Sequence, residues 1–258
     1  MMEKLGKIWL ALILAFLYLP ILVMMAMAFN QSALYELPFT FDLIWFKALL
    51  GNEKLLQASL NSVLIAIANT MIATTLGTMA AYAFSRYEFR GKAVLQLLLF
   101  PPITIPWLII GTSMLIFFFW TGIGRGLHAI LLGHVALSLP YVIVVVGAQL
   151  KNYPVTLEEA AASLGATPMQ IFWRVSLPVI APGVAAAAAF AFAVSFDQFV
   201  ISYFLAPPGV STLPVEIYSA IRKGFTPEIN AISTIIIVAS MGLMLLVARN
   251  YRFGGSRK

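Results

Sequence analysis

Few side chains in this sequence could carry chemistry, and they lie far apart. The 258 residues contain no cysteine, so thiolate nucleophiles, thiolate metal sites and disulfides are excluded. His128 and His134 are six residues apart and do not share a helical face well, so helix-end hydrogen bonding explains them better than metal binding. Gly91-Lys92 lacks the other residues of a phosphate-binding loop, and no H-E-x-x-H or G-x-S-x-G signature occurs. We therefore expect no catalytic residue and no metal site.

One acidic residue stands apart, because Asp197 falls well inside an apolar stretch. An ionisable side chain within a membrane is costly and is a functional candidate by default. Asp197 would either line a path for a solute or form a hydrogen bond that stabilises a partner helix. We interpret the neighbouring aromatic residues Phe199 and Tyr203 as packing residues.

The composition identifies the solvent of most of the chain as lipid. Hydrophobic residues make up 61% of the chain and charged residues 10%, against roughly 25% charged residues in a soluble domain. A span needs about 20 apolar residues, and we predict six spans. They are Ile8–Ala28, Leu60–Phe84, Val94–Trp120, Ala129–Leu150, Gly183–Leu205 and Ala231–Ala248. The first is too long for the apolar region of a signal peptide, about 7–15 residues, so we expect a retained anchor.

The basic residues predict the orientation of these spans. With the amino terminus inside, eleven of the 16 Lys and Arg residues fall on that side and five on the other. The positive-inside rule therefore predicts that both termini are cytoplasmic. This asymmetry also explains the net charge of +6, so we expect no nucleic-acid partner.

Small residues and prolines predict how the spans pack. Gly77 and the alanine run 185–189 would allow close contact between helices in lipid. Pro101, Pro102 and Pro106 predict a broken or kinked third span, which is tolerated where protein or a cavity surrounds it.

The segment between the fourth and fifth spans, 153–179, has strong local signals for two short helices. Thr156 and Glu159 have the spacing of a capping box, and Gly165 is typical of a left-handed helix stop. A second capping box begins at Thr167, and we expect Pro178 to end that helix. The product would be two helices joined at a glycine corner on the cytoplasmic surface.

This segment resembles the EAA loop of bacterial ABC importer permeases. Glu159-Ala160-Ala161, then Gly165, then Leu177-Pro178 reproduce the spacing of that loop, with Val175 where isoleucine is usual. The resemblance implies that the loop docks into a groove of a separate ATPase. An amphipathic helix resting on the bilayer is the alternative. The residues assigned to ATPase coupling are Glu158, Glu159, Ala160, Ala161, Gly165, Leu177 and Pro178.

The resemblance extends from about Leu60 to Ala248. The residues from Ser195 onward are similar to the second permease of spermidine/putrescine-type importers. This implies an all-α membrane protein with the fold of a type I ABC importer permease, six transmembrane helices and a two-helix cytoplasmic coupling loop, in the bacterial inner membrane. The implied partners are an ABC ATPase dimer, a second permease and a periplasmic or lipoprotein substrate-binding protein. The permease pair is usually a heterodimer, although a homodimer remains open.

The same resemblance indicates a solute path and the function. Asp197 and Gln198 occupy the positions of an acidic pair, and Trp107 stands where the group often has a second carboxylate. Trp107 could supply a cation–π face instead. We expect a small organic solute, a polyamine or related cation, to move by alternating access. A neutral or anionic solute, such as an amino acid derivative, a sugar or a phosphonate, is the alternative.

Other functional classes fit the sequence less well. An ion-coupled secondary transporter usually shows buried charge pairs or repeated halves, and an intramembrane hydrolase needs a converging nucleophile and base. A structural scaffold would not need the spacing of the EAA loop. We therefore expect no enzyme activity and no cofactor in this chain, with ATP and Mg²⁺ bound by the partner ATPase. We expect an anchor helix and external loop over 1–58, a five-helix core over 59–250 with the loop at about 153–179, and a basic tail over 251–258.

Overall fold

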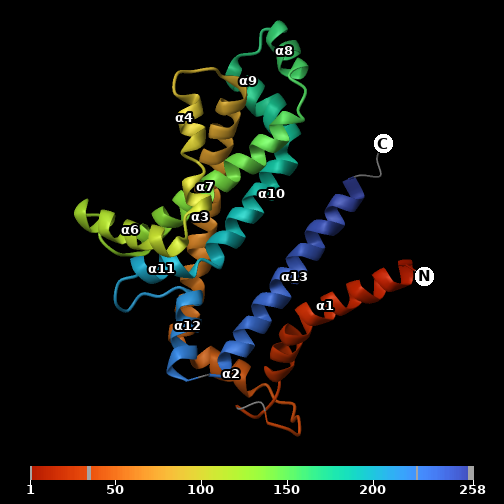
Figure 1. Ribbon diagram of the computed structural model, residues 1–258, viewed down its shortest axis with the longest axis vertical. Coiled ribbons are helices and arrows are strands. Elements are labelled where there is room, and N and C mark those ends of the chain that lie inside the picture. The colour runs from red at the N-terminus through yellow and green to blue at the C-terminus, as the bar shows by residue number, and fades with distance from the viewer. Residues whose placement is uncertain (1, 34–35, 225, 255–258) are drawn as a thin grey trace. The chain divides into compact units, whose positions relative to one another are not determined.

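The computed structural model describes residues 2–33, 36–224 and 226–254, in which the regular structure is helical. One isolated bridge pairs Asn30 with Phe41. Figure 1 shows the helices, whose bounds are α1 Met2–Met27, α2 Ile44–Gly51, α3 Glu53–Arg86, α4 Lys92–Leu97, α5 Pro101–Thr104, α6 Trp107–Trp120, α7 Leu127–Lys151, α8 Thr156–Ser163, α9 Pro168–Ile171, the π-helical turn η1 Phe172–Ser176, α10 Leu177–Phe196, α11 Phe199–Leu205, α12 Leu213–Lys223 and α13 Glu228–Gly254.

Four helical segments within the described residues are long and apolar enough to span a membrane, and a bent pair raises that number to five. The four are Gly6–Met27, Glu53–Arg86, Leu127–Lys151 and Pro168–Phe196. The apolar part of α13 over 228–242 is shorter than a span, and the side chains beyond residue 242 lie outside the description. The all-helical membrane architecture is therefore confirmed, whereas six spans are not.

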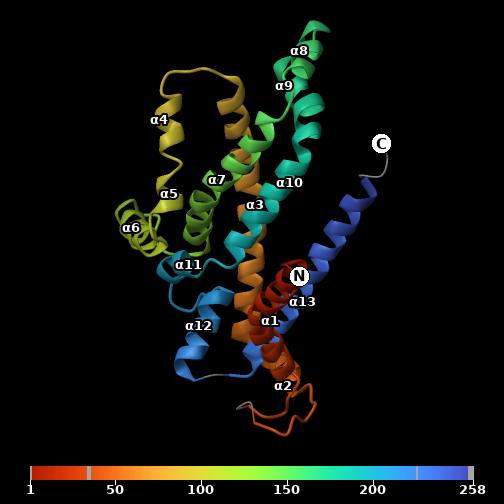
Figure 2. The same ribbon diagram turned by 45° about the vertical axis from the view of Figure 1, so that its right-hand side comes forward.

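The prolines break the third predicted span, as expected. The segments Lys92–Thr104 and Trp107–Trp120 meet at an angle of 110°, so that α6 lies across the direction of α4 (Figure 2). Ile105 and Pro106 both have extended backbone, with ψ near 136° and 132°. Two consecutive extended residues cannot continue a helix, and the residue before a proline favours this region.

The fifth predicted span, Gly183–Leu205, is wrong in its bounds. The helix that contains Gly183 extends back to Pro168 and ends at Phe196, and α11 forms a separate short helix. Asp197 and Gln198 occupy the break between α10 and α11. The apolar run continues across this break, so hydropathy gave no sign of it.

The chain divides into two compact units, Gln57–Glu216 and Met1–Leu56 with Ile217–Lys258. In the unit Gln57–Glu216, the helices α3, α7 and α10 share an apolar core. A Cβ on Gly77 would meet Val142 Cγ1 at 2.5 Å, and Ala187 and Ala191 are fully buried. Close backbone approach is how helices associate in lipid, so the expected role is confirmed for Gly77 and Ala187. The other alanines of the run 185–189 are exposed or only partly buried in the isolated subunit.

In the other unit, a buried asparagine holds the loop between α1 and α2. The Asn30 side chain donates to the Glu36 carbonyl at 3.0 Å and accepts from the Thr40 amide at 2.9 Å. The backbone carbonyl of Asn30 accepts a hydrogen bond from Trp45 Nε1 at 2.8 Å. Since Asn30 is fully buried, these bonds satisfy groups that would otherwise be costly.

Candidate functional site

The loop between α7 and α10 begins with a helix that ends in a Schellman motif. Gly165 has a φ of +83°, its amide donates to the Ala162 carbonyl at 2.9 Å, and the Ala166 amide donates to the Ala161 carbonyl at 3.1 Å. These two bonds satisfy carbonyls that the end of α8 leaves without partners. The predicted glycine corner is confirmed.

The predicted capping box at Thr156 is wrong. Thr156 is already the first residue of α8, and Val155 precedes it with helical backbone and no side-chain cap. The Leu157 and Glu158 amides donate to the carbonyls of Pro154 and Val155. Because these backbone carbonyls already satisfy the first amides of α8, no threonine cap is needed.

The second capping box is present, but the helix after it does not end at Pro178. Gln170 N donates to Thr167 Oγ1 at 3.4 Å, and Thr167 N donates to Gln170 Oε1 at 2.9 Å. The helix then passes through the wider turn η1 and continues as α10 to Phe196. Proline lacks an amide and its ring clashes with the carbonyl four residues before it. The wide turn lies directly before Pro178 and accommodates both defects.

The predicted coupling residues separate into an exposed group and one buried residue. Glu159, Ala160, Gly165 and Pro178 are exposed, and Ala161 and Leu177 are partly buried. Apolar side chains surround them on the same loop: Leu157 (44% exposed), Leu164 (90%), Met169 (66%) and Trp173 (58%). The loop therefore presents apolar side chains that its own chain does not cover. Figure 1 shows α8 and α9 beyond one end of α7 and α10, and α11 near the other end of α10.

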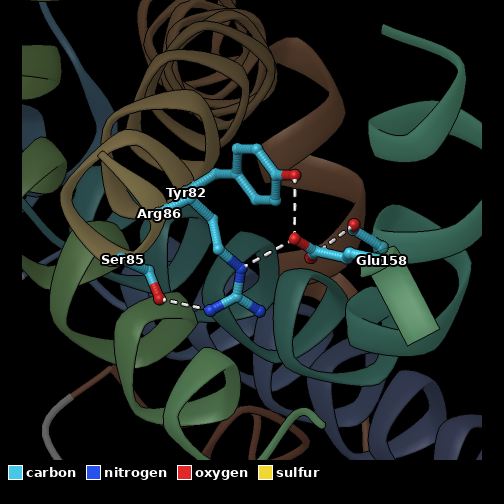
Figure 3. Close-up of polar contacts among 5 residues, drawn as sticks. Tyr82, Ser85, Arg86 and Glu158 are labelled. Carbon is cyan, nitrogen blue, oxygen red and sulfur yellow. Dashed lines mark hydrogen bonds and ion pairs between the residues drawn. The ribbon is translucent and has the colours of Figure 1, made fainter. Parts of the chain in front are cut away.

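Glu158 is the buried member of the predicted set, and its carboxylate contacts two other elements. Glu158 Oε2 lies 3.0 Å from Arg86 Nε and accepts from the Tyr82 hydroxyl at 3.4 Å, both on α3 (Figure 3). Glu158 Oε1 accepts a hydrogen bond from Ser176 Oγ at 2.7 Å, in the turn η1. The Arg86 and Glu158 side chains are 12% and 11% exposed. This ion pair therefore joins the first turn of α8 to the end of α3.

Aromatic rings surround the Arg86 guanidinium. Its Cζ lies 5.2 Å from the centre of the Tyr153 ring, and 5.9 Å from the centre of the Tyr82 ring. Arg86 Nη1 donates to Ser85 Oγ at 2.9 Å, as Figure 3 shows. Cation–π contacts strengthen when the cation is desolvated, so this end of α3 is held by charge and by ring contacts.

The three residues predicted to line a solute path all lie next to helix breaks. Asp197 is exposed in the isolated subunit, and no hydrogen bond or ion pair of its carboxylate occurs within the described part of the chain. Gln198 is buried, and its Oε1 accepts from the Val200 amide, which caps α11. Trp107 begins α6 and is 40% exposed. The helices α6 and α11 pack closely, since a Cβ on Gly111 would meet Phe204 Cδ2 at 2.9 Å.

Sequence reasoning missed a buried histidine that connects both sides of the second break. His134 Nδ1 lies 2.8 Å from Ser195 Oγ, and His134 Nε2 lies 3.0 Å from Ser202 Oγ. Ser202 Oγ donates to the Gln198 carbonyl at 2.8 Å. Helix-end hydrogen bonding is confirmed for His128, which contacts the Ile123 carbonyl, but is wrong for His134. The seven-residue spacing of the two serines was the available signal. Among the described residues, no three His, Asp or Glu side chains converge on a possible metal site.

Replacing His134 with alanine is expected to lower the free energy of unfolding by about 2–3 kcal/mol, because a buried hydroxyl loses its partner and a cavity opens. Thermal unfolding of the purified protein in detergent measures this. His128→Ala is the matched control and should leave the midpoint nearly unchanged, because His128 is exposed. Equal midpoints for the two variants would contradict a structural role for His134.

Comparisons with known proteins agree on one family. Residues 73–254 match the family model described as "Binding-protein-dependent transport system inner membrane component". The chain is 35% identical over 247 residues to the spermidine/putrescine transport system permease protein PotC of Escherichia coli strain K12, covering 95% of this chain and 94% of that protein. It is also 35% identical over 241 residues to the putrescine transport system permease protein PotI of the same strain, covering 90% of this chain and 85% of the relative.

Solved structures support the fold alone, because their sequence identities are low. A chain of a bacterial ABC transporter involved in the import of the acidic polysaccharide alginate superposes with a TM-score of 0.71 at 15% identity, covering 98% of this chain and 96% of the other. A chain of the MetNI methionine ABC transporter, in an inward-facing conformation, gives a TM-score of 0.60 at 20% identity, with coverages of 80% and 100%.

Proposed function

Because this chain belongs to the family of binding-protein-dependent transport system inner membrane components, the permeases of ABC importers, we propose that it forms half of a path for a small organic cation such as a polyamine. The chain is a multi-pass protein of the bacterial inner membrane. It is not itself the ATPase, and ATP is bound by the ATPase partner. The observation that carries the cargo proposal is the similarity to spermidine/putrescine and putrescine permeases over nearly the whole chain.

The environment of Asp197 supports a cationic cargo. Its carboxylate lies directly after the end of α10, where the last carbonyls of the helix carry partial negative charge. The same carboxylate is exposed in the isolated subunit, so it is accessible to a solute or a partner subunit. A carboxylate beside a helix carboxyl terminus attracts a cation, as the broken helices of other transporters do.

The other two predicted path residues limit the charge of this path. Gln198 is buried and its Oε1 caps α11, whereas its Nε2 has no hydrogen-bond partner among the described residues. Trp107 is neutral, and its ring at the start of α6 could contact a cation through its π face. One carboxylate per subunit favours a cargo of few charges, so a diamine fits better than a longer polyamine. A neutral or anionic solute is the outcome that would replace this proposal.

The loop over 153–179 is proposed as the contact with the ATPase. Its exposed apolar side chains surround Glu159 and Gly165, and such side chains gain most when a partner buries them. The Schellman turn and the capping box give the loop a defined shape before it binds, which reduces the entropy lost on binding.

The partners proposed are an ATPase dimer, a second permease in a heterodimer, and a substrate-binding protein outside.

The number of spans and the location of the termini are also part of the proposal. We assign six spans, counting the bent segment over 92–120 and α13 as one span each, with both termini in the cytoplasm because most basic residues lie on that side. The chain would comprise an anchor and external loop over 1–58, a permease core over 59–250 and a basic tail over 251–258. Residues 255–258 of that tail lie outside the described residues.

The proposal is tested by uptake into proteoliposomes that contain the complex of this chain with its partner permease and ATPase, supplied with the binding protein. Labelled putrescine should accumulate with ATP on the ATPase side, and it should not accumulate with a non-hydrolysable analogue. Uptake driven by a proton or sodium gradient without ATP would contradict the importer mechanism and would support an ion-coupled transporter.

A further inference from the structure

We propose that Glu158 does not contact the ATPase but acts as a positioning residue, which transmits displacement of the coupling loop to α3 and α10 through Arg86 and Ser176. The proposal deepens the proposed function and rests on it, because it assumes that an ATPase moves this loop. It divides the two adjacent glutamates by role, with Glu159 on the docking surface and Glu158 inside.

The direction of the two side chains supports this division. Consecutive residues on a helix point about 100° apart, so neighbours on α8 face different surroundings. Glu159 is exposed, whereas Glu158 is buried against α3 and η1. A carboxylate with both oxygens occupied by partners in its own chain is poorly placed to bind an ATPase.

The two oxygens of Glu158 contact two different elements of the permease. Oε2 contacts Arg86 and Tyr82 near the end of α3, and Oε1 contacts Ser176 at the end of η1. Figure 3 shows Arg86 and Tyr82 directed toward the same carboxylate. If α8 shifted while α3 and η1 stayed in place, the ion pair with Arg86 and the short hydrogen bond from Ser176 would both break.

Burial makes this connection stiff. Breaking a buried ion pair leaves an uncompensated charge, and that cost is much larger than the cost of separating an exposed pair. Arg86 also lies over the Tyr153 ring, which follows the end of α7. Arg86 Nη2 is buried and has no hydrogen-bond partner among the described residues. The buried guanidinium therefore depends on the Glu158 carboxylate to compensate its charge. The pair should move as a unit.

Ser176 connects this unit to the helix that leads to Asp197. Ser176 is fully buried and immediately precedes α10, which runs from Leu177 to Phe196 and ends beside Asp197. A rigid helix with packed neighbours can carry a displacement along its length. The experiment must therefore measure coupling as well as assembly.

The test compares Glu158→Gln with wild type in the reconstituted complex. Basal ATPase activity and the amount of assembled complex should be retained, because the docking surface is unchanged. The stimulation of ATPase activity by the loaded binding protein, and the solute transported per ATP, should both fall by about two- to thirty-fold. Arg86→Gln should give the same loss, and the double variant should be no worse than either single one.

Glu88→Gln is the matched control. It removes an exposed ion pair with Lys92 (2.6 Å between Nζ and Oε1, with the Glu88 side chain 90% exposed), in the loop that follows α3. Exposed pairs contribute little, so stimulation should remain at the wild-type level.

Two milder variants keep the test decisive if Glu158→Gln fails to assemble. Ser176→Ala and Tyr82→Phe each remove one contact to Glu158 with little change in volume, and each should reduce stimulation per assembled complex. Full stimulation in assembled Ser176→Ala and Glu158→Gln complexes would overturn the proposal. Weaker ATPase binding by Glu158→Gln, with normal stimulation in the complexes that do form, would also overturn it. If the wild-type complex does not respond to polyamines, only the proposed cargo is contradicted. The stimulation of ATPase activity in the variant, relative to wild type, can still be measured with any solute that stimulates the wild-type complex.

Discussion

Replacing Gly165 with proline is expected to reduce transport by more than about a hundredfold. Gly165 has a φ of +83° and its amide donates to the Ala162 carbonyl. Proline fixes φ near −65° and has no amide, so the corner between α8 and α9 cannot form without a cost of about 3 kcal/mol or more, which corresponds to that factor. The measurement is ATP-driven uptake in proteoliposomes together with the amount of ATPase that copurifies.

Gly91→Pro is the control for this variant. Gly91 has a φ of +86° with open space around it, so proline creates the same backbone mismatch in the loop between α3 and α4. We expect that variant to bind the ATPase and to transport nearly as well as wild type. A Gly165→Pro complex that assembles and transports at the wild-type rate would exclude the glycine corner as a coupling element.

Replacing Asp197 with asparagine is expected to reduce putrescine uptake by roughly 30- to 100-fold at a subsaturating concentration. The change removes a charge and keeps the shape, and losing one partner of a partly desolvated charge pair costs about 2 kcal/mol or more. The measurement is the initial rate of labelled putrescine uptake over a range of concentrations. Complex assembly should be unaffected, because the carboxylate has no hydrogen bond or ion pair within the described residues.

Asp42→Asn provides a matched control for the loss of charge. Asp42 precedes α2, and its Oδ1 accepts from the Leu43 amide at 2.6 Å, a bond that asparagine can keep. Uptake should not change in this variant. Reduced assembly of the Asp197→Asn complex, with normal uptake per complex, would show that Asp197 contacts a partner helix and does not line the path.

The sequence predicted much of the local structure of the loop over 153–179 because the chemistry of turns is local. Gly165 and the Thr167–Gln170 box act within a few residues of chain, so their spacing is visible without a structure. The same reasoning failed at Thr156, where backbone carbonyls already satisfy the first amides of the helix. It failed at Pro178 because a π-helical turn absorbs the proline, and no residue pattern indicated that turn.

The contacts that join distant segments could not be predicted in this way. Arg86 and Glu158 are 72 residues apart, and His134 and Ser195 are 61 residues apart. Each pair forms because helices pack side by side, and hydropathy does not report which faces meet. Hydropathy also missed the break at Asp197, because the residues on both sides are apolar and the break is made by backbone and side-chain hydrogen bonds.

The most direct test of the function is the ATPase activity of the reconstituted complex, with its binding protein, titrated against putrescine, spermidine, small amino acids and a panel of sugars. Stimulation by putrescine at lower concentration than by spermidine, with no response to the amino acids or sugars, is the result we expect from a cation path that contains Asp197. Stimulation only by a neutral or anionic compound would contradict the polyamine cargo. It would leave the permease role in place and would make Trp107 and Gln198 the residues to examine for specificity.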